Sequence, residues 1–274
     1  MGSKLPTWRR VSRSDMVEGG ETCPDAEAAA ARELAAKPRK AVKPRPSASM
    51  VLLDRSGAEP KVLLGRRNAA LAFLPGKYVF PGGRLEIDDR VMPAAGALRA
   101  TCLKRLALRR SRHSPAPEAF ALAAIRETFE ETGLLLGTKV PTGPAAPIPS
   151  AWQDFIGHGF MPFLTPLRFI ARALTPTPFS RRYDTSFFLL DVSEIVHRME
   201  GCITPDAEFV ELVWLTLGEA LQHDIPRITA MILRDLKTRI AADFPEHLPV
   251  PFFYMRGPHW IREELSDQAI QGHD

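Results

Sequence analysis

The sequence predicts an α+β fold in which a mixed β-sheet is covered by helices. Strand signals come first along the chain, a helix follows, and further strands precede a second helix, an order that favours a mixed sheet over a parallel doubly wound one. The sequence has neither a GxGxxG run after a strand nor GxxxxGK[ST], so a dinucleotide-binding fold and a P-loop are not supported. Of the 274 residues, 45% are hydrophobic and 25% are charged, proportions typical of a globular domain.

The first expected elements are strands. Ser49–Asp54 and Lys61–Arg66 are hydrophobic runs separated by the turn-like RSGAEP, which predicts a hairpin. A third strand at Tyr78–Phe80 leads into PGGRLE, whose two glycines permit backbone conformations that are closed to other residues.

Helices and strands alternate in the rest of the chain. A helix is expected at Pro117–Thr132, with Gly133 as its C-terminal cap. A second, amphipathic helix is expected at Pro226–Phe244, where apolar residues recur near helical spacing. Three further strands are expected, at Leu167–Leu174, Tyr183–Val192 and Phe209–Leu215.

We expect three parts in the chain: a peripheral basic segment over residues 1–46, a domain over 47–250, and a C-terminal tail over 251–274. The stretch KPRKAVKPRP, at the end of the first part, holds five cationic side chains and no acid. We favour a solvated linker over a nucleic-acid-binding patch for this stretch, because its prolines hold the chain open.

Composition favours a cytoplasmic protein. The sequence has no run of about 18 apolar residues, and its N-terminus lacks the apolar core of a signal peptide, so a membrane span is not expected. Cys23, Cys102 and Cys202 are widely spaced and form no CxxC, which indicates reduced thiols rather than a disulfide framework or a zinc site. The net charge of +4 suits an anionic ligand.

Three glutamates share one face of the helix expected at 117–132. Glu127, Glu130 and Glu131 lie at i, i+3 and i+4, where like charges repel and destabilise an isolated helix. The apolar residues of this helix, which include Ile125 and Phe129, fall on nearly the opposite face. A divalent cation would compensate for the repulsion, and a solvated acidic face is the alternative.

The glutamates belong to a longer pattern, Arg126-Glu-x-x-Glu-Glu-x-Gly133, which chance produces in about one chain in a few thousand at ordinary residue frequencies. With Gly83 upstream, this pattern resembles the Nudix box of the Nudix hydrolases, G-x5-E-x7-R-E-U-x-E-E-x-G-U. Asp89 stands where the box has its first glutamate, and Thr128 stands at a usually aliphatic position. The box is interrupted, because 36 residues separate Asp89 from Arg126 where seven are usual.

The resemblance implies a Nudix-type mixed sheet sandwiched between helices, with an insertion at about 90–117. The inserted segment, Val91–Pro117, holds six Lys or Arg residues and no acid, and apolar residues such as Leu103 and Leu106 indicate a helix. We favour an exposed basic helix, and a lobe that gathers substrate phosphates is the alternative.

The resemblance also implies the site. Glu127, Glu130 and Glu131 would bind Mg²⁺ or Mn²⁺ together with the backbone carbonyl of Gly82, and Arg126 would brace the glutamates. Glu208 and Glu211 are the candidates for a general base on a later loop, and Glu208 is the first choice. Substrate contacts are expected from five residues: Arg66, Arg67, Gly83, Arg181 and Arg182.

The insertion and the run FLPGKYVFPGG resemble the branch of the family that includes coenzyme A diphosphatases. Leu63, Leu64, Gly76 and Phe80–Gly83 fit the coenzyme A pattern LLTxT[SA]x3Rx3Gx3FPGG, but Gly65, Arg67, Asn68 and Ala72 depart from it. The resemblance therefore implies hydrolysis of a nucleoside diphosphate linked to another moiety, with coenzyme A or acyl-CoA first.

Other substrates and another class of function stay open. ADP-ribose, nucleotide sugars and dinucleotides are the alternative substrates, and a non-catalytic Nudix-fold module that binds nucleotides or RNA is the alternative class. The intact glutamates favour the enzyme. The expected partner is thus a nucleoside diphosphate-linked small molecule rather than a membrane or a nucleic acid, and a homodimer is left open.

Overall fold

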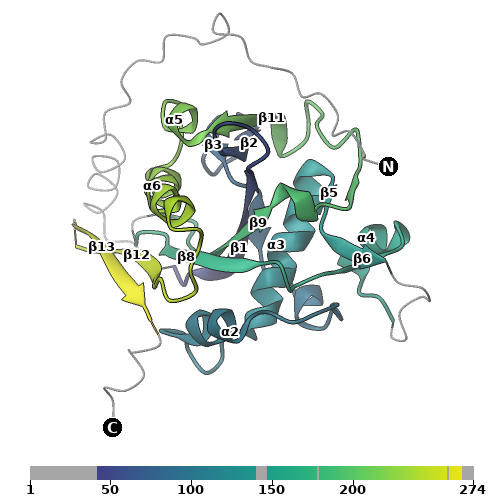
Figure 1. The fold of residues 1–274 in the computed structure, drawn as a ribbon, viewed down its shortest axis with the longest axis horizontal. Coiled ribbons are helices and arrows are strands. Elements are labelled where there is room, and N and C mark those ends of the chain that lie inside the picture. The colour runs from purple at the N-terminus through teal and green to yellow at the C-terminus, as the bar shows by residue number, and fades with distance from the viewer. Residues whose placement is uncertain (1–41, 140–146, 178, 258, 267–274) are drawn as a thin grey trace, which may run out of the picture.

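The computed structural model describes residues 42–139, 147–177, 179–257 and 259–266, and its centre is a mixed β-sheet (Figure 1). Within these ranges nine strands form the main sheet: β1 (Arg45–Asp54), β2 (Lys61–Arg67), β3 (Tyr78–Val79), β4 (Gly82–Arg84), β8 (Arg168–Leu174), β9 (Tyr183–Asp191), β11 (Phe209–Thr216), β12 (Val250–Arg256) and β13 (His259–Leu265). The strand order is β11-β2-β1-β9-β8-β12-β13, while β3 pairs with β2 and β4 with β1. β1 is parallel to β9 and β8 to β12, and the other pairs are antiparallel.

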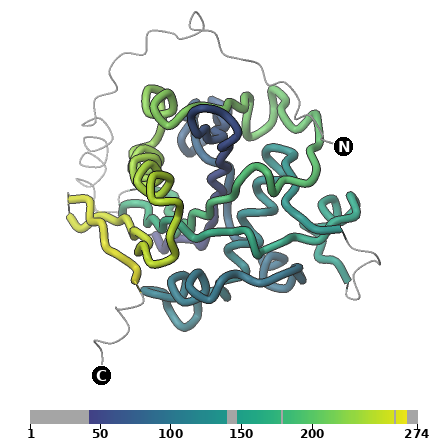
Figure 2. The backbone as a smooth tube through the Cα atoms, in the orientation of Figure 1, coloured from purple at the N-terminus to yellow at the C-terminus, as the bar shows by residue number. Residues whose placement is uncertain are grey.

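Two long helices, α3 (Pro117–Thr132) and α6 (Arg227–Ala241), cover opposite faces of this sheet (Figure 2). Successive side chains of a strand point to opposite faces, and β1 separates two cores in this way. Met50 and Leu52 belong to the core formed with α3, whereas Val51 belongs to the core formed with α6. The predicted sheet between helices is therefore confirmed.

Smaller elements surround the sheet. Short helices and strands fill the connections: α2 (Ala100–Ala107), α4 (Gln153–Gly157), α5 (Leu217–Ala220), β5 (Leu134–Leu135), β6 (Gly137–Lys139), β7 (Phe160–Pro162) and β10 (His197–Arg198). Three 3-10 turns are η2 (Asp88–Arg90), η3 (Ser150–Trp152) and η4 (Val192–Glu194). β10 pairs with β5 and β6 with β7, outside the main sheet. Helix α2 lies in the inserted segment, where the sequence predicts a helix.

The prediction of a C-terminal tail from residue 251 is wrong. β12 and β13 form an antiparallel hairpin, and β12 joins the main sheet beside β8 through the register Phe252↔Arg172 and Phe253↔Ala173. Phe253 is only 2% exposed, so the hairpin contributes to the core under α6. Burial of such aromatic side chains explains why this segment is ordered rather than a tail.

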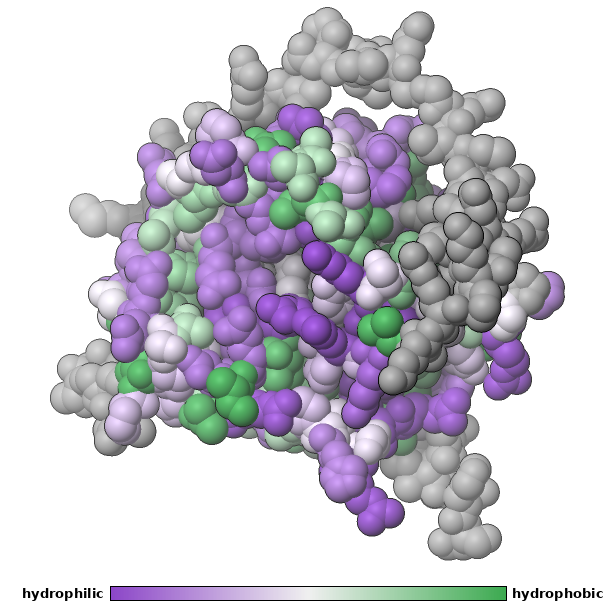
Figure 3. All heavy atoms as spheres, turned by 180° about the vertical axis from the view of Figure 1, so that it is seen from behind, coloured by the Kyte–Doolittle hydropathy of each residue, from purple (hydrophilic) through white to green (hydrophobic). Residues whose placement is uncertain are grey.

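The other expectations about the chain ends and the surface have mixed outcomes. The predicted peripheral segment lies mostly outside the described residues, but Arg45 and Pro46 already pair with β9. Cys102 and Cys202 are free thiols, and Cys23 is outside the described ranges. Among the described residues no helix has the length and apolar character needed to cross a bilayer. The view from behind shows mainly hydrophilic side chains with small separate hydrophobic areas (Figure 3).

Candidate active site

Helix α3 carries the predicted glutamates and forms for local reasons. Pro117 occupies its first turn, and Gly133 caps its C-terminus with a φ of 71°, its N–H donating to the Phe129 carbonyl at 2.8 Å. Ile125 and Phe129 are buried in the core on the α3 side of the sheet, as predicted. Thr128, at the usually aliphatic position, is also buried because its hydroxyl donates to the Ala124 carbonyl at 2.6 Å.

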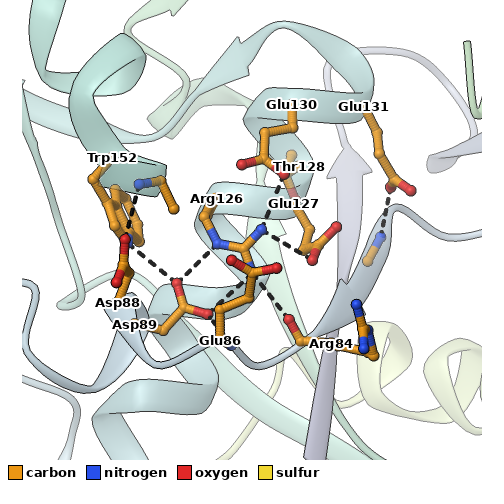
Figure 4. A network of polar contacts seen from close by, with 12 residues as sticks. Arg84, Glu86, Asp88, Asp89, Arg126, Glu127, Thr128, Glu130, Glu131 and Trp152 are labelled. Carbon is orange, nitrogen blue, oxygen red and sulfur yellow. Dashed lines mark hydrogen bonds and ion pairs between the residues drawn. The ribbon is translucent and has the colours of Figure 1, made fainter. Parts of the chain in front are cut away.

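Arg126 links the glutamates to the start of the insertion (Figure 4). Its guanidinium is 3% exposed and binds Asp89 with two bonds, Nε to Oδ1 at 2.9 Å and Nη2 to Oδ2 at 3.0 Å. Nη1 lies 3.0 Å from a carboxylate oxygen of both Glu127 and Glu130. Burial alone would lower the pKa of Arg126, but the hydrogen bond to Asp89 and the surrounding carboxylates raise it above its ordinary value. Arg126 is therefore a permanent cation that orients two of the three glutamates.

Asp89, at the position of the first glutamate of the box, is the buried partner of Arg126. Its side chain is fully buried, and it also accepts hydrogen bonds from the Glu86 N–H at 2.8 Å and from Trp152 Nε1 at 3.2 Å. Because η2 ends at Arg90, the insertion leaves the site immediately after Asp89. The 36-residue separation in sequence consequently leaves the Arg126–Asp89 pair intact. Trp152 was not among the predicted site residues, since its role depends on a contact 63 positions away.

Glu131 is the most deeply buried of the three glutamates. The Gly82 N–H donates to its Oε2 at 2.8 Å, while Oε1 is buried without a hydrogen-bond partner among the described residues. Burial raises the pKa of Glu131 well above its ordinary value, and the charges of Glu127 and Glu208 raise it further. Gly82 approaches β1 so closely that a Cβ there would lie 2.4 Å from the Ala48 carbonyl oxygen, so a side chain cannot be accommodated.

Glu127 lies against the second glycine of the FPGG run. A Cβ on Gly83 would lie 2.4 Å from Glu127 Oε2, so a larger residue there would displace this carboxylate from its observed position. Burial raises the pKa of Glu127 to about 7, although Arg126 acts in the opposite direction. Burial raises the pKa of Glu130 as well. The single positive charge of Arg126 thus cannot neutralise all the carboxylates around it, those of Asp89, Glu127 and Glu130.

These carboxylates fit a hard divalent cation. Within the described ranges no three His, Cys, Asp or Glu side chains converge closely enough to hold a metal as the structure stands, because Glu127 and Glu130 are paired with Arg126. The unpartnered Glu131 Oε1 and the raised pKa values of Glu127 and Glu131 nevertheless mark an excess of buried negative charge. Carboxylate oxygens are the ligands that Mg²⁺ and Mn²⁺ prefer.

A cavity of about 810 Å³ extends from the glutamates along the α6 side of the sheet. Glu127, Glu130 and Arg126 line it, as do three of the predicted substrate contacts, Arg67, Gly83 and Arg181. The lining also includes residues that the sequence did not single out, from β1, β8, β9, α6 and the C-terminal hairpin, namely Ser47, Ser49, Ala173, Thr185, Phe187, Ile228, Thr229, Met255 and Trp260.

Arg66 and Arg182, also predicted to contact substrate, do not line this cavity. Arg66 pairs with Glu211 at 2.9 Å, and Arg182 donates to the carbonyls of Thr175 and Val42, both at 2.9 Å. Glu211 and Val42 lie 145 and 140 positions away from their arginines, which is why the sequence alone did not reveal these contacts.

The two candidate general bases differ in their position relative to the cavity. Glu208 lines the cavity, and its charge acts on Glu127 and Glu131. Arg67 Nη1 holds Glu208 Oε1 at 2.5 Å, while Arg67 Nε donates to the Phe73 carbonyl at 2.9 Å. Glu211 instead accepts from Tyr78 and from Arg66, outside the cavity.

No residue of the inserted segment lines the cavity, so the alternative of a phosphate-gathering lobe at this site is wrong. The favoured reading, an exposed basic helix, is also wrong for two of its arginines. Arg105 is 7% exposed and donates to the Leu248 carbonyl, and the Arg110 side chain is 5% exposed and pairs with Asp184 at 3.0 Å. These cations connect the insertion to the sheet and the C-terminal hairpin.

Two curated proteins of the same name are similar to this chain. The chain is 31% identical to acyl-coenzyme A diphosphatase NUDT19 of Gallus gallus over 60% of this chain and 56% of that protein, and 28% identical to the protein of the same name from Homo sapiens over 59% and 55%. The chain thus spans about half the length of the curated relatives it matches. No family model matches the chain.

A solved structure also matches. The NUDIX hydrolase from Alicyclobacillus acidocaldarius superposes with a TM-score of 0.51 at 27% identity, covering 70% of this chain and 90% of that one. The predicted Nudix-type fold and the resemblance to the acyl-coenzyme A diphosphatase branch are both confirmed.

Proposed function

Because the chain has the Nudix fold and resembles acyl-coenzyme A diphosphatases in sequence, we propose that it is a metal-dependent Nudix diphosphatase. One observation carries the proposal: Glu127 lines a large cavity together with Gly82, and the buried Glu131, which accepts a hydrogen bond from the Gly82 N–H, has its Oε1 without a partner among the described residues. A sensor that only binds nucleotides would gain nothing from this buried and uncompensated charge.

In this proposal Glu127, Glu130 and Glu131, together with the carbonyl of Gly82, hold Mg²⁺ or Mn²⁺. The bound metal supplies neutralisation of the diphosphate and an acidified water. Arg126 keeps the glutamates oriented through its bonds to Asp89, a role whose loss typically lowers metal affinity or activity about 10–100-fold.

Glu208 is the proposed general base. Its position at the cavity is fixed by Arg67, which contacts only Oε1 within the described part of the chain, and its side chain is 43% exposed. Oε2 is therefore open to take a proton from the attacking water. Arg181 also lines the cavity and is the proposed contact for a phosphate of the substrate.

We propose coenzyme A or acyl-CoA as substrate. The support comes from the relatives, which are named acyl-coenzyme A diphosphatases, and from the partial fit to the coenzyme A pattern. The size of the cavity agrees, since about 810 Å³ is in the upper part of the range of about 300–1,000 Å³ found for small-molecule sites. Cleavage of the diphosphate would release adenosine 3′,5′-bisphosphate and a phosphopantetheine.

The test is a substrate panel with product identification by mass spectrometry. Purified protein with Mg²⁺ or Mn²⁺ is offered coenzyme A, an acyl-CoA, ADP-ribose, a nucleotide sugar and a dinucleotide. We expect coenzyme A compounds to be cleaved fastest, no turnover in EDTA, and a loss of about 10²–10⁴-fold in kcat for Glu208→Gln. Glu118→Gln, a change on the same helix as the metal-binding glutamates but outside the cavity, is the control. Faster cleavage of ADP-ribose would refute the substrate, and turnover in EDTA would refute the metal.

A further inference from the structure

Large apolar side chains line the cavity beyond the glutamates. Five side chains, Phe179, Tyr183, Ile228, Met255 and Trp260, are here called the apolar subsite. They come from β9, α6, β12, β13 and the β8–β9 connection, and all five are only partly buried. Large apolar side chains gathered in a cavity while remaining accessible mark a surface that a ligand can cover.

The C-terminal hairpin builds the outer wall of the apolar subsite. Met255 of β12 and Trp260 of β13 are directly opposite in the antiparallel register, so their side chains share one face of the hairpin. The pairing Phe253↔Ala173 places Met255, two residues along, on the same face as Ala173, which packs under α6. The Arg227 guanidinium lies 5.9 Å from the centre of the Trp260 ring and supports it from α6.

The two ends of the cavity are far apart. From β4, which carries Gly82 and Gly83, the sheet passes through β1, β9, β8 and β12 to reach β13. At about 4.8 Å for each step between strands, a ligand that contacts both ends must extend over roughly 20–25 Å. Such a reach calls for an extended molecule with an anionic end and an apolar end.

The chemistry of the apolar subsite favours hydrocarbon. Only the Tyr183 hydroxyl and the Trp260 indole N–H are polar among its five side chains. Arg181, Arg227 and His259, from the same segments, also line the cavity and suit the polar part of the same ligand. Met255 has a flexible, polarisable side chain that adapts to varied apolar shapes.

On the basis of the proposed function, we propose that the apolar subsite binds the acyl chain of an acyl-CoA, whose diphosphate lies at the glutamates. The protein then discriminates by chain length. Each methylene of the acyl chain that becomes buried should raise kcat/KM by a factor of about 3–4, until the subsite is full.

The experiment compares kcat/KM for free coenzyme A with acetyl-, hexanoyl- and dodecanoyl-CoA. In the wild type we expect the ratio of dodecanoyl-CoA to coenzyme A to be at least about 10. Trp260→Ala removes one wall and should lower this ratio several-fold, and Met255→Trp fills the subsite and should lower it without opening a cavity. Ile261→Ala is the matched control, because Ile261 follows Trp260 on β13, faces the other way and does not line the cavity.

Binding of dodecanoyl-CoA to the Glu130→Gln variant, measured by calorimetry in EDTA, gives a readout that is independent of turnover. We expect Trp260→Ala, introduced into this background, to weaken dodecanoyl-CoA at least about 5-fold more than adenosine 3′,5′-bisphosphate. An equal weakening of both ligands would overturn the inference and assign the subsite to the nucleotide. If free coenzyme A and the three acyl-CoAs are cleaved with the same kcat/KM, the inference is overturned while the proposed function stands.

Discussion

Replacing Glu131 by Gln should stabilise the metal-free protein and abolish its turnover. Glu131 is 7% exposed, its Oε1 has no partner among the described residues, and Glu127 and Glu208 oppose its charge. Glutamine preserves the shape and the hydrogen bond from the Gly82 N–H, but it carries no charge. The proposed metal ligand thereby becomes a neutral buried amide.

The size of the effect follows from proton linkage. Because the pKa of Glu131 in the folded protein is raised above the ordinary 4.5, the folded state holds a proton that the unfolded state has released, and stability is lost as pH rises above about 4.5. The loss is at most about 1.4 kcal/mol for each pH unit. The advantage of Gln should therefore be small near pH 5 and reach about 2 kcal/mol near pH 7.5, or roughly 4–8 °C in Tm.

The assay is thermal unfolding in EDTA at pH 5 to 8, with turnover measured separately in Mg²⁺. Glu130→Gln is the matched control, since the Glu130 side chain is 45% exposed and its charge can be hydrated; it should lose turnover without a comparable gain in Tm. The reasoning is refuted if Glu131→Gln melts below wild type at pH 7.5 in EDTA, or if it still turns over substrate.

Three further outcomes are expected. Mg²⁺ should raise the Tm of the wild type more at pH 8 than at pH 6, because Glu127, with a pKa of about 7, is then deprotonated; an equal rise at both pH values would contradict its role as a ligand. Asp89→Asn should weaken Mg²⁺ activation about 10–100-fold in an activity titration, since Arg126 loses its charged partner, and an unchanged titration would argue against the brace. Arg110→Ala should lower the free energy of unfolding in urea by the lower end of about 3–5 kcal/mol while KM stays unchanged, whereas Arg112→Ala, at an exposed position, should change neither quantity.

Helix α3 could be predicted because its determinants are local. Apolar spacing, Pro117 at the start and Gly133 at the end lie within one short segment, and the predicted and observed bounds of α3 agree. Asp89 could be assigned to the motif for another reason: a short motif with fixed residue types survives a long insertion, because loop length costs little entropy. Its pairing with Arg126 was found only in the structure.

The apolar end of the cavity could not be predicted in this way. The runs VPFFYMR and HWIREEL flank Gly257 and are rich in aromatic and apolar residues, so a hairpin was readable from the sequence. Its pairing with β8, however, joins Phe253 to Ala173, 80 positions apart, and no local pattern encodes that register. The same limit applies to Arg110, whose partner Asp184 lies 74 positions away.

Strand β9 relates the insertion to the cavity, although no inserted residue lines it. Tyr183 and Thr185 face the cavity, while Asp184 and Ser186, which alternate with them, face the other side. There Arg110 donates to Asp184 at 3.0 Å and to Ser186 at 2.7 Å, and Arg172 binds Asp184 with two bonds of 2.7 Å. The insertion thus secures the floor of the cavity from behind. Arg110 pairs with Asp184, Arg109 with Glu263 and Arg99 with Glu246, so three of the six cations in this acid-free segment meet acids from other parts of the described chain.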